Sequence, residues 1–117
     1  FFIDSLRSEN LKESPIALEG KSILFLNGTD TKGLAAYFSR FIKNIGGDVF
    51  ASGNAQKRYE KSLIVADDLE SYTLRRVSQT LNISDVRSKH EDQLVEEPSI
   101  VRADITVIFG FDKASEL

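Results

Sequence analysis

Length, composition and charge indicate one ordinary globular domain. The chain has 117 residues, of which 41% are hydrophobic and 28% are charged, and this composition is sufficient for one buried core. The net charge of −3 provides no basic field, so we expect no nucleic-acid partner. Cysteine is absent from the sequence, which excludes thiol nucleophiles, disulfides and thiolate metal sites.

The N-terminal region differs in pattern from the rest of the chain. Residues 1–20 carry scattered apolar side chains among polar ones and include a Ser14-Pro15 break. We interpret residues 1–20 as a leader or linker and residues 21–117 as the folded domain. The longest apolar runs, at residues 23–26 and 63–66, are far shorter than the roughly 20 residues of a transmembrane helix.

The first half of the domain has the pattern of a strand, a helix and a second strand. Residues 22–26 contain a continuous apolar run followed by Asn27-Gly28, which predicts a buried strand and a turn. Apolar side chains recur at spacings of three and four within residues 34–45, which predicts a helix that Gly46-Gly47 ends. Residues 48–52 predict a second strand, parallel to the first through a right-handed crossover. Candidates to cap the helix are Thr29, Asp30 and Thr31.

The second half predicts further strands around a second helix. Residues 62–66 form an apolar run that Asp67-Asp68 ends. Ser71 is a candidate to cap a helix that ends near Asn82. The apolar face of this helix consists of Leu74, Val77 and Leu81. The remaining elements are a weak fourth strand at residues 83–88, an acidic loop at 90–98 and a last strand at 104–109.

The order of these elements fixes the expected fold class. The order β-α-β-β-α-(β)-β predicts a compact single α/β domain, with two helices on a mixed β-sheet. Three of the strands are apolar at nearly every position, so both faces of the sheet should be covered. Because two helices do not easily cover both faces, we expect the leader, a second copy of the domain or another partner to cover the second one.

The sequence offers no convincing catalytic set. His90 is the only imidazole, so a nucleophile–histidine pair has little support. Metal ligation by His90 with its acidic neighbours is weaker than its interpretation as a solvated loop, so we expect no metal. Asp67-Asp68 is a possible acid–base pair, but such residues more often form turns and precede helices. The acidic neighbours of His90 are Glu91, Asp92, Glu96 and Glu97.

Two turns are the best candidates for a ligand site. Residues 27–33 lead from a strand into a helix N-terminus, where backbone N–H groups can face an anion. The order Lys32-Gly33 does not match a Walker A loop, and Gly28 can instead supply unusual backbone angles to a tight turn. Basic residues at 57, 58 and 61 are interpreted as a solvated face, although a surface that follows an acidic polymer is an alternative. Both turns follow predicted parallel strands, where open α/β sheets place ligands. The candidate ligand-binding residues are Asn27, Gly28, Thr29, Lys32, Gly33, Gly53 and Asn54.

Several short landmarks recur in a fixed order along the domain. They are Ile23-Leu24-Phe25-Leu26-Asn27-Gly28-Thr29, Gly33-Leu34-Ala35, Gly47-Asp48-Val49, Gly53-Asn54-Ala55 and Ala103-Asp104-Ile105-Thr106-Val107-Ile108-Phe109-Gly110 with Asp112. Together they resemble the LytR cell envelope-related C-terminal domain (LytR_C) family over roughly residues 21–112.

The resemblance implies a location and a function class. It implies a bacterial, extracytoplasmic accessory domain of the cell envelope, with no cofactor and no established catalytic residues. The expected partner is peptidoglycan or an envelope glycopolymer, and the alternative is a protein–protein interaction or homodimerisation module of an envelope-assembly protein. Membrane attachment is expected only through an anchor in the parent protein, which can carry a separate phosphotransferase domain.

Overall fold

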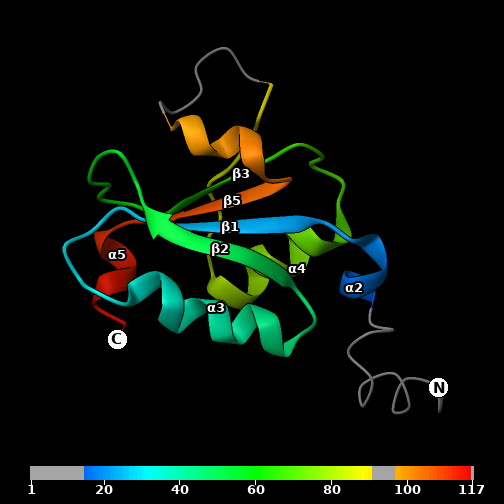
Figure 1. The fold of residues 1–117 in the computed structure, drawn as a ribbon, viewed down its shortest axis with the longest axis horizontal. Coiled ribbons are helices and arrows are strands. Elements are labelled where there is room, and N and C mark those ends of the chain that lie inside the picture. The colour runs from blue at the N-terminus through cyan, green and yellow to red at the C-terminus, as the bar shows by residue number, and fades with distance from the viewer. Residues whose placement is uncertain (1–14, 91–96, 117) are drawn as a thin grey trace.

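A mixed five-stranded sheet forms the centre of the molecule (Figure 1). This computed structural model describes residues 15–90 and 97–116. The strand order is β2-β1-β5-β3-β4, in which β1 is parallel to β2 and to β5, and β3 is parallel to β4. The sheet is mixed because β3 and β5 are antiparallel. The strands are β1 (Ser22–Asn27), β2 (Asp48–Asn54), β3 (Leu63–Ala66), β4 (Val86–Ser88) and β5 (Ile105–Phe109).

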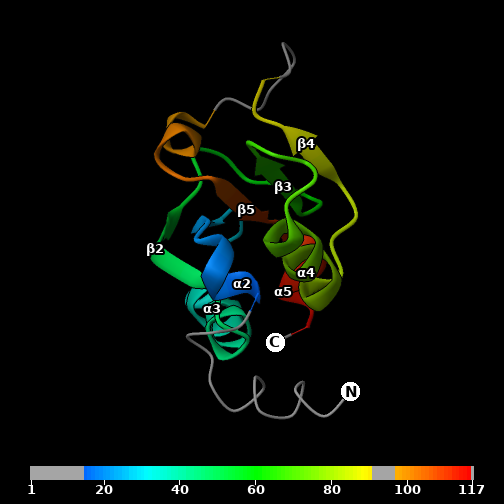
Figure 2. The same ribbon diagram turned by 90° about the vertical axis from the view of Figure 1, so that its right-hand side faces the viewer.

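Helices lie on both sides of this sheet. Figures 1 and 2 show α3 (Leu34–Asn44) and α4 (Tyr72–Leu81) on one face, with the 3-10 helix η2 (Pro98–Arg102) on the other. The short helices α2 (Pro15–Glu19) and α5 (Phe111–Ala114) flank the first layer. The predicted α/β class, the element order and the weak fourth strand are confirmed. No helix among the described residues is both long enough and apolar enough to cross a bilayer.

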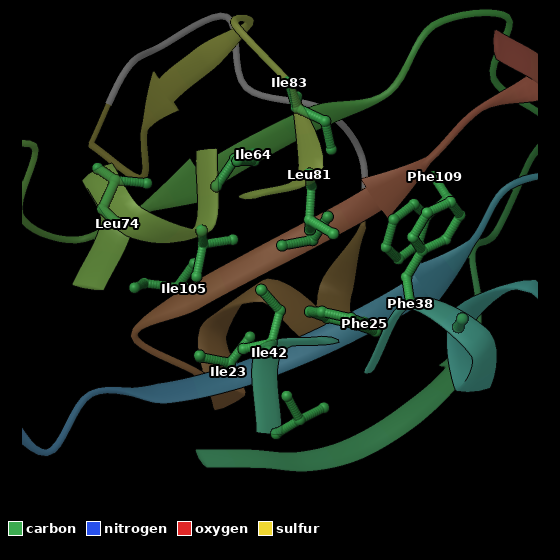
Figure 3. Packing of buried hydrophobic residues seen from close by; sticks show 14 of the residues in the cluster. Ile23, Phe25, Phe38, Ile42, Ile64, Leu74, Leu81, Ile83, Ile105 and Phe109 are labelled. Atoms are coloured by element: carbon green, nitrogen blue, oxygen red, sulfur yellow. The ribbon is translucent and has the colours of Figure 1, made fainter. Parts of the chain in front are cut away.

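The larger core lies between the sheet and the two long helices (Figure 3). Phe38 of α3 stacks on Phe109 of β5, with ring centroids 5.0 Å apart. Phe25 of β1 meets the same Phe109 ring edge to face at 5.1 Å. Each fully buried side chain of this size contributes roughly 1.5–3 kcal/mol, so these rings fix α3 against the sheet.

A second core covers the opposite sheet face and replaces the expected external cover. Side chains of β1, β3 and β5 pack there against Tyr59, Ile100 and Ala103 of the same chain. Neither a second copy nor a partner is therefore required to cover this face. The leader also proposed for this role lies largely outside the described residues, which begin at Pro15. Ile100 lies in a short Ile100-Val101 pair beside a charged loop, and two residues show no helix or strand period that would indicate which of them is buried.

The helix ends confirm some predicted caps and correct others. The hydroxyl of Ser71 accepts a hydrogen bond from the backbone N–H of Leu74 at 3.1 Å, so the predicted cap of α4 is confirmed. Asn82 adopts φ 55° where α4 ends, and Gly46 adopts φ 96° just beyond α3. The expected caps of α3 are wrong: Gly33 stands at the cap position with φ 79° and offers no side chain, so Thr29, Asp30 and Thr31 do not cap this helix.

Helix α2 contributes a further cap to α4. The carboxylate of Glu19 accepts hydrogen bonds from the Ser71 hydroxyl at 2.7 Å and from the backbone N–H groups of Tyr72 and Thr73 at 3.0 and 2.8 Å. Burial would raise the pKa of Glu19, but the hydrogen bonds from Thr73, Ser71 and Tyr72 lower it from 4.5 to about 2. A carboxylate at a helix N-terminus also interacts favourably with the helix dipole. Residues 15–19 are thus attached to the domain by this contact.

We expect Glu19→Gln to lower the free energy of unfolding by about 1 kcal/mol at neutral pH, the size typical of a lost helix cap. Exposure of Glu19 to solvent keeps this figure well below what the pKa alone suggests. Because the folded-state pKa is depressed, the stabilisation is complete above pH 4.5 and is lost as pH falls toward about 2. Urea unfolding of both proteins across this range measures the difference.

The matched control is Glu70→Gln, which removes an exposed carboxylate one residue before Ser71. Its effect should stay within a few tenths of a kcal/mol, as for most surface substitutions. An equal loss in both variants, or a difference that does not change with pH, would contradict the role assigned to Glu19.

Candidate functional site

The candidate site lies where the parallel strands β1 and β2 end. Asn27 and Asn54 are register partners at the last positions of these strands. The backbone N–H of Ala55 then donates to the carbonyl oxygen of Asn27 at 3.0 Å. The two turns predicted from the sequence are therefore adjacent at one sheet edge, as the parallel pairing requires.

The side chain of Asn27 organises the first turn. Its Oδ1 accepts hydrogen bonds from the backbone N–H and the hydroxyl of Thr29, at 2.9 and 2.7 Å. Its Nδ2 donates to the carbonyl oxygen of Thr31 at 2.8 Å. Asn side chains commonly form such local bonds in turns. Asn27 and Thr29 thus hold the shape of the loop, and their polar atoms are already engaged within it.

Gly28 is required by close packing and not by unusual backbone angles. It is not among the described residues with positive φ, so the expected role is wrong. A Cβ at this position would lie 2.6 Å from Cδ1 of Tyr59 and 2.8 Å from the carbonyl oxygen of Phe109. The Gly28 N–H donates to that same carbonyl, and the Gly28 carbonyl accepts from the Tyr59 N–H, both at 2.8 Å. Only glycine fits this junction without movement of its neighbours.

A polar cleft of about 260 Å³ opens between the two loops. The loop after β1 contributes Asp30 to its lining, and the loop after β2 contributes Arg58. The Asp30 Oδ1 atom accepts from Arg58 Nε at 2.7 Å, so the two loops are joined by an ion pair. Lys57 lies 5.5 Å above the ring of Tyr59, a geometry that favours a cation at this position. The cleft is lined by residues 27–30 and 54–58.

A second hollow of about 270 Å³ lies beside the cleft and shares Asn27 and Asn54 with it. Gly33 and Gly53 line this hollow, together with small residues at the start of α3. Of the predicted binding residues, only Lys32 lines neither hollow. The structure therefore brings the other six together at one edge of the sheet.

Part of the cleft is lined by residues outside the seven predicted to bind a ligand. All of these residues except Asp30 lie in one segment, residues 55–58. Asp30 was predicted to cap a helix. The sequence indicates a solvated face at the basic pair Lys57-Arg58, with a surface that follows an acidic polymer as the alternative. The signal that links this pair to the site is its position in the sequence: Lys57 lies only three residues after Asn54, at the end of the second strand. The lining residues outside the predicted set are Asp30, Ala55, Gln56, Lys57 and Arg58.

Glu97 holds the base of this loop from the buried side. Its side chain is 3% exposed. The carboxylate accepts from the Gln56 N–H at 2.8 and 3.0 Å and from the Tyr59 hydroxyl at 2.7 Å. Buried carboxylates need such partners because desolvation is otherwise strongly unfavourable. Glu97 therefore connects the segment before η2 to the loop that lines the cleft.

The other acidic candidates have structural roles. Asp67 forms an ion pair with Lys21 at 3.4 Å, and Asp68 accepts from the Glu70 N–H at 2.9 Å. Burial would lower the pKa of Lys21, but the charges of Asp67, Asp104 and Asp68 raise it above 10.5. No group of three acidic or histidine side chains within the described ranges could hold a metal ion. His90 is exposed, and residues 91–96 lie outside the described part of the chain.

We expect Gly28→Ala to destabilise the fold by about 1–3 kcal/mol, the usual effect of overpacking a tight site. The added methyl group meets a backbone carbonyl that cannot move independently of β5. Gly53→Ala is the matched control, since its Cβ would meet only Leu26 Cδ2 at 3.8 Å. Urea unfolding should separate the two variants, and equal stability of both would contradict the packing role of Gly28.

We expect Glu97→Gln to lower the free energy of unfolding by about 1–3 kcal/mol, because the amide NH2 group that replaces one carboxylate oxygen is a donor facing the Gln56 N–H, which contacts both oxygens of Glu97. The control is Glu60→Gln, an exposed glutamate in the same loop. Thermal and urea unfolding measure the loss. A Glu97→Gln protein as stable as the control would show that the buried contact does not hold this loop.

Comparison with known families identifies the family of the chain. A family model described as LytR cell envelope-related transcriptional attenuator (LytR_C) matches residues 22–112. This range includes β1, β2 and every residue that lines the two hollows. No curated protein and no solved structure matches the chain. LytR_C is an accessory domain of cell-envelope proteins and not a known catalytic domain. Because the match covers most of the chain, this protein belongs to the LytR_C family.

Proposed function

We propose that this domain is a non-catalytic, extracytoplasmic module that binds peptidoglycan or an envelope glycopolymer in the cleft between residues 27–30 and 54–58. The observation that carries the proposal is the polar cleft at the carboxyl ends of β1 and β2. Open α/β sheets commonly bind ligands at this edge. Membership of a cell-envelope family directs the choice of ligand toward wall polymers.

The chemistry of the cleft suits a chain of sugars. Asn54 and Gln56 expose amide side chains that both donate and accept hydrogen bonds, which matches the hydroxyl and acetamido groups of glycans. Lys57 and Arg58 add positive charge at the same place. No set of groups resembling a nucleophile with its base is found among these lining residues. Recognition is therefore the chemistry that the cleft supports best.

The dimensions of the site favour a segment of a polymer over an enclosed small molecule. At about 260 Å³ the cleft is smaller than the roughly 300–1,000 Å³ of typical small-molecule pockets. The neighbouring hollow shares Asn27 and Asn54 with it, so a ligand can extend along the sheet edge from one to the other. An extended glycan makes use of both.

The interaction or homodimerisation alternative loses its main support. That alternative depended on an uncovered apolar sheet face, and Tyr59, Ile100 and Ala103 cover this face. Within the described part of the chain, the sheet no longer demands a partner.

We expect the purified chain to cosediment with isolated peptidoglycan sacculi as a monomer, with light-scattering mass recorded on the same sample. The double variant Asn54→Ala/Gln56→Ala should bind about tenfold more weakly, since each lost hydrogen bond removes about 0.5–1.5 kcal/mol. Added salt should weaken binding further, because exposed charges are screened.

The control is Gln79→Ala, which removes an exposed amide from α4, away from the cleft. Its binding should match the unmodified protein. Absence of sedimentation, or equal binding by the double variant and the control, would overturn the assignment of the cleft. A stable dimer without affinity for sacculi would direct attention to protein partners.

A further inference from the structure

An ion pair closes across the cleft from one loop to the other. Asp30 belongs to the loop after β1, and Arg58 belongs to the loop after β2. A single carboxylate oxygen, Oδ1 of Asp30, accepts a hydrogen bond from Nε of Arg58 at 2.7 Å and lies 2.6 Å from its Nη2 in the ion pair. The two side chains remain 66% and 69% exposed, so they meet in water at the mouth of the cleft.

The N–H groups that Asp30 occupies are those that guanidinium groups use to bind ligand oxyanions. The edge of Arg that carries Nε and Nη2 matches the two oxygens of a carboxylate or phosphate. Here a single protein oxygen, Oδ1 of Asp30, faces this edge and accepts a hydrogen bond from Nε alone, while Nη2 only lies within ion-pair distance of it. A ligand oxyanion that presents two oxygens would pair with Arg58 more completely than Asp30 does.

Displacement of Asp30 should be easy. Exposed ion pairs contribute little to stability, because water already solvates both charges well. Among the residues that line the cleft, Asp30 is the only acid, whereas Lys57 and Arg58 are both basic. Once Asp30 turns away, the cleft offers two cations beside the amides of Asn54 and Gln56.

We propose that Arg58 binds an oxyanion borne on the glycan, either a carboxylate or a phosphodiester, and that Asp30 is a built-in competitor that the ligand displaces. This inference rests on the function proposed above and narrows it from glycans in general to acidic ones. Asp30 then sets the minimum affinity for Arg58 that a ligand must have. A weakly binding anion does not displace Asp30, whereas a polymer that repeats the anion along its length does.

The test measures binding of the full chain to three fluorescent probes at fixed low ionic strength. The probes are oligogalacturonate, which carries carboxylates, poly(glycerol phosphate), which carries phosphodiesters, and a neutral chito-oligosaccharide. We expect Asp30→Asn to bind at least one acidic probe about threefold to fivefold more tightly, which corresponds to removal of one exposed ion pair. We expect Arg58→Gln to bind the same probe at least about tenfold more weakly, through the loss of charge-assisted hydrogen bonds.

The double variant Asp30→Asn/Arg58→Gln distinguishes competition from a general effect of charge. If Asp30 acts by occupying Arg58, the gain from Asp30→Asn disappears when Arg58 is absent, and the double variant binds like Arg58→Gln alone. If Asp30 acts only by repelling anions, the gain persists in the double variant, and the competitor role is overturned. The acidic probe that gains affinity identifies the oxyanion as a carboxylate or a phosphodiester.

Asp85→Asn is the matched control. Asp85 pairs with Arg87 at 3.0 Å, is likewise exposed, and does not line the cleft. The control has the same change in net charge, so an equal gain with this variant would overturn the proposal. Equal affinity of the unmodified protein for the neutral and acidic probes would overturn the oxyanion inference alone and leave glycan binding intact. Failure to bind sacculi as well would remove both proposals.

Discussion

The backbone junction at Gly28 is the contact on which the arrangement of the site depends. Gly28 donates to the carbonyl oxygen of Phe109 and accepts from the N–H of Tyr59, so the end of β1 is joined both to β5 and to the loop after β2. The Tyr59 carbonyl in turn accepts from the N–H of Phe111, which draws α5 to the same point. Side chains are excluded here because a Cβ on Gly28 would overlap both neighbours. The cleft exists because this junction brings its two walls together.

The loop that forms one wall is fixed at its base and exposed at its tip. Asp112 accepts from the N–H and the hydroxyl of Ser62, at 3.0 and 2.8 Å, where the loop enters β3. Glu97 holds Gln56 and Tyr59 from the buried side. Between these contacts, residues 56–58 remain exposed. A cation on such a loop loses little conformational freedom on binding, because the backbone that carries it is already held.

The sequence predicted the parts of the fold that follow from local patterns. Apolar runs located β1, β3 and β5, spacings of three and four located α3 and α4, and Ser71 was correctly identified as a cap. It could not predict the cover of the second sheet face, since Tyr59 and Ile100 are far apart in the sequence and come together only after folding. The capping of α3 failed for a related reason. Thr29, Asp30 and Thr31 all precede the cap position, which Gly33 occupies, and the Thr29 hydroxyl bonds within the turn to Asn27.

The sequence predicts the strand ends at the candidate site but not the side-chain contacts between its loops. Parallel pairing of β1 and β2 follows from the strand–helix–strand order, and this alone places Asn27 beside Asn54. The pairing of Asp30 with Arg58 depends on how two loops pack around Gly28, which local patterns do not encode. Glu97 illustrates the same limit, because an acidic residue beside Pro98 gives no sign that it is buried against Tyr59.

The carboxylates that maintain the fold differ from Asp30, the carboxylate in the cleft, in their hydrogen-bond partners. Glu19, Glu97 and Asp112 each accept at least two hydrogen bonds from the chain, so their oxygens maintain the fold. Asp30 differs because its partner is an exposed cation at the mouth of a cleft. Disruption of the first group destabilises the protein, since buried or capped donors are left unsatisfied. When the Asp30–Arg58 ion pair is broken, the carboxylate and the guanidinium group both remain solvated by water. Asp30 and Arg58 are therefore the charged pair in the cleft that can exchange partners without disturbing the domain, which is what reversible binding of a charged polymer requires.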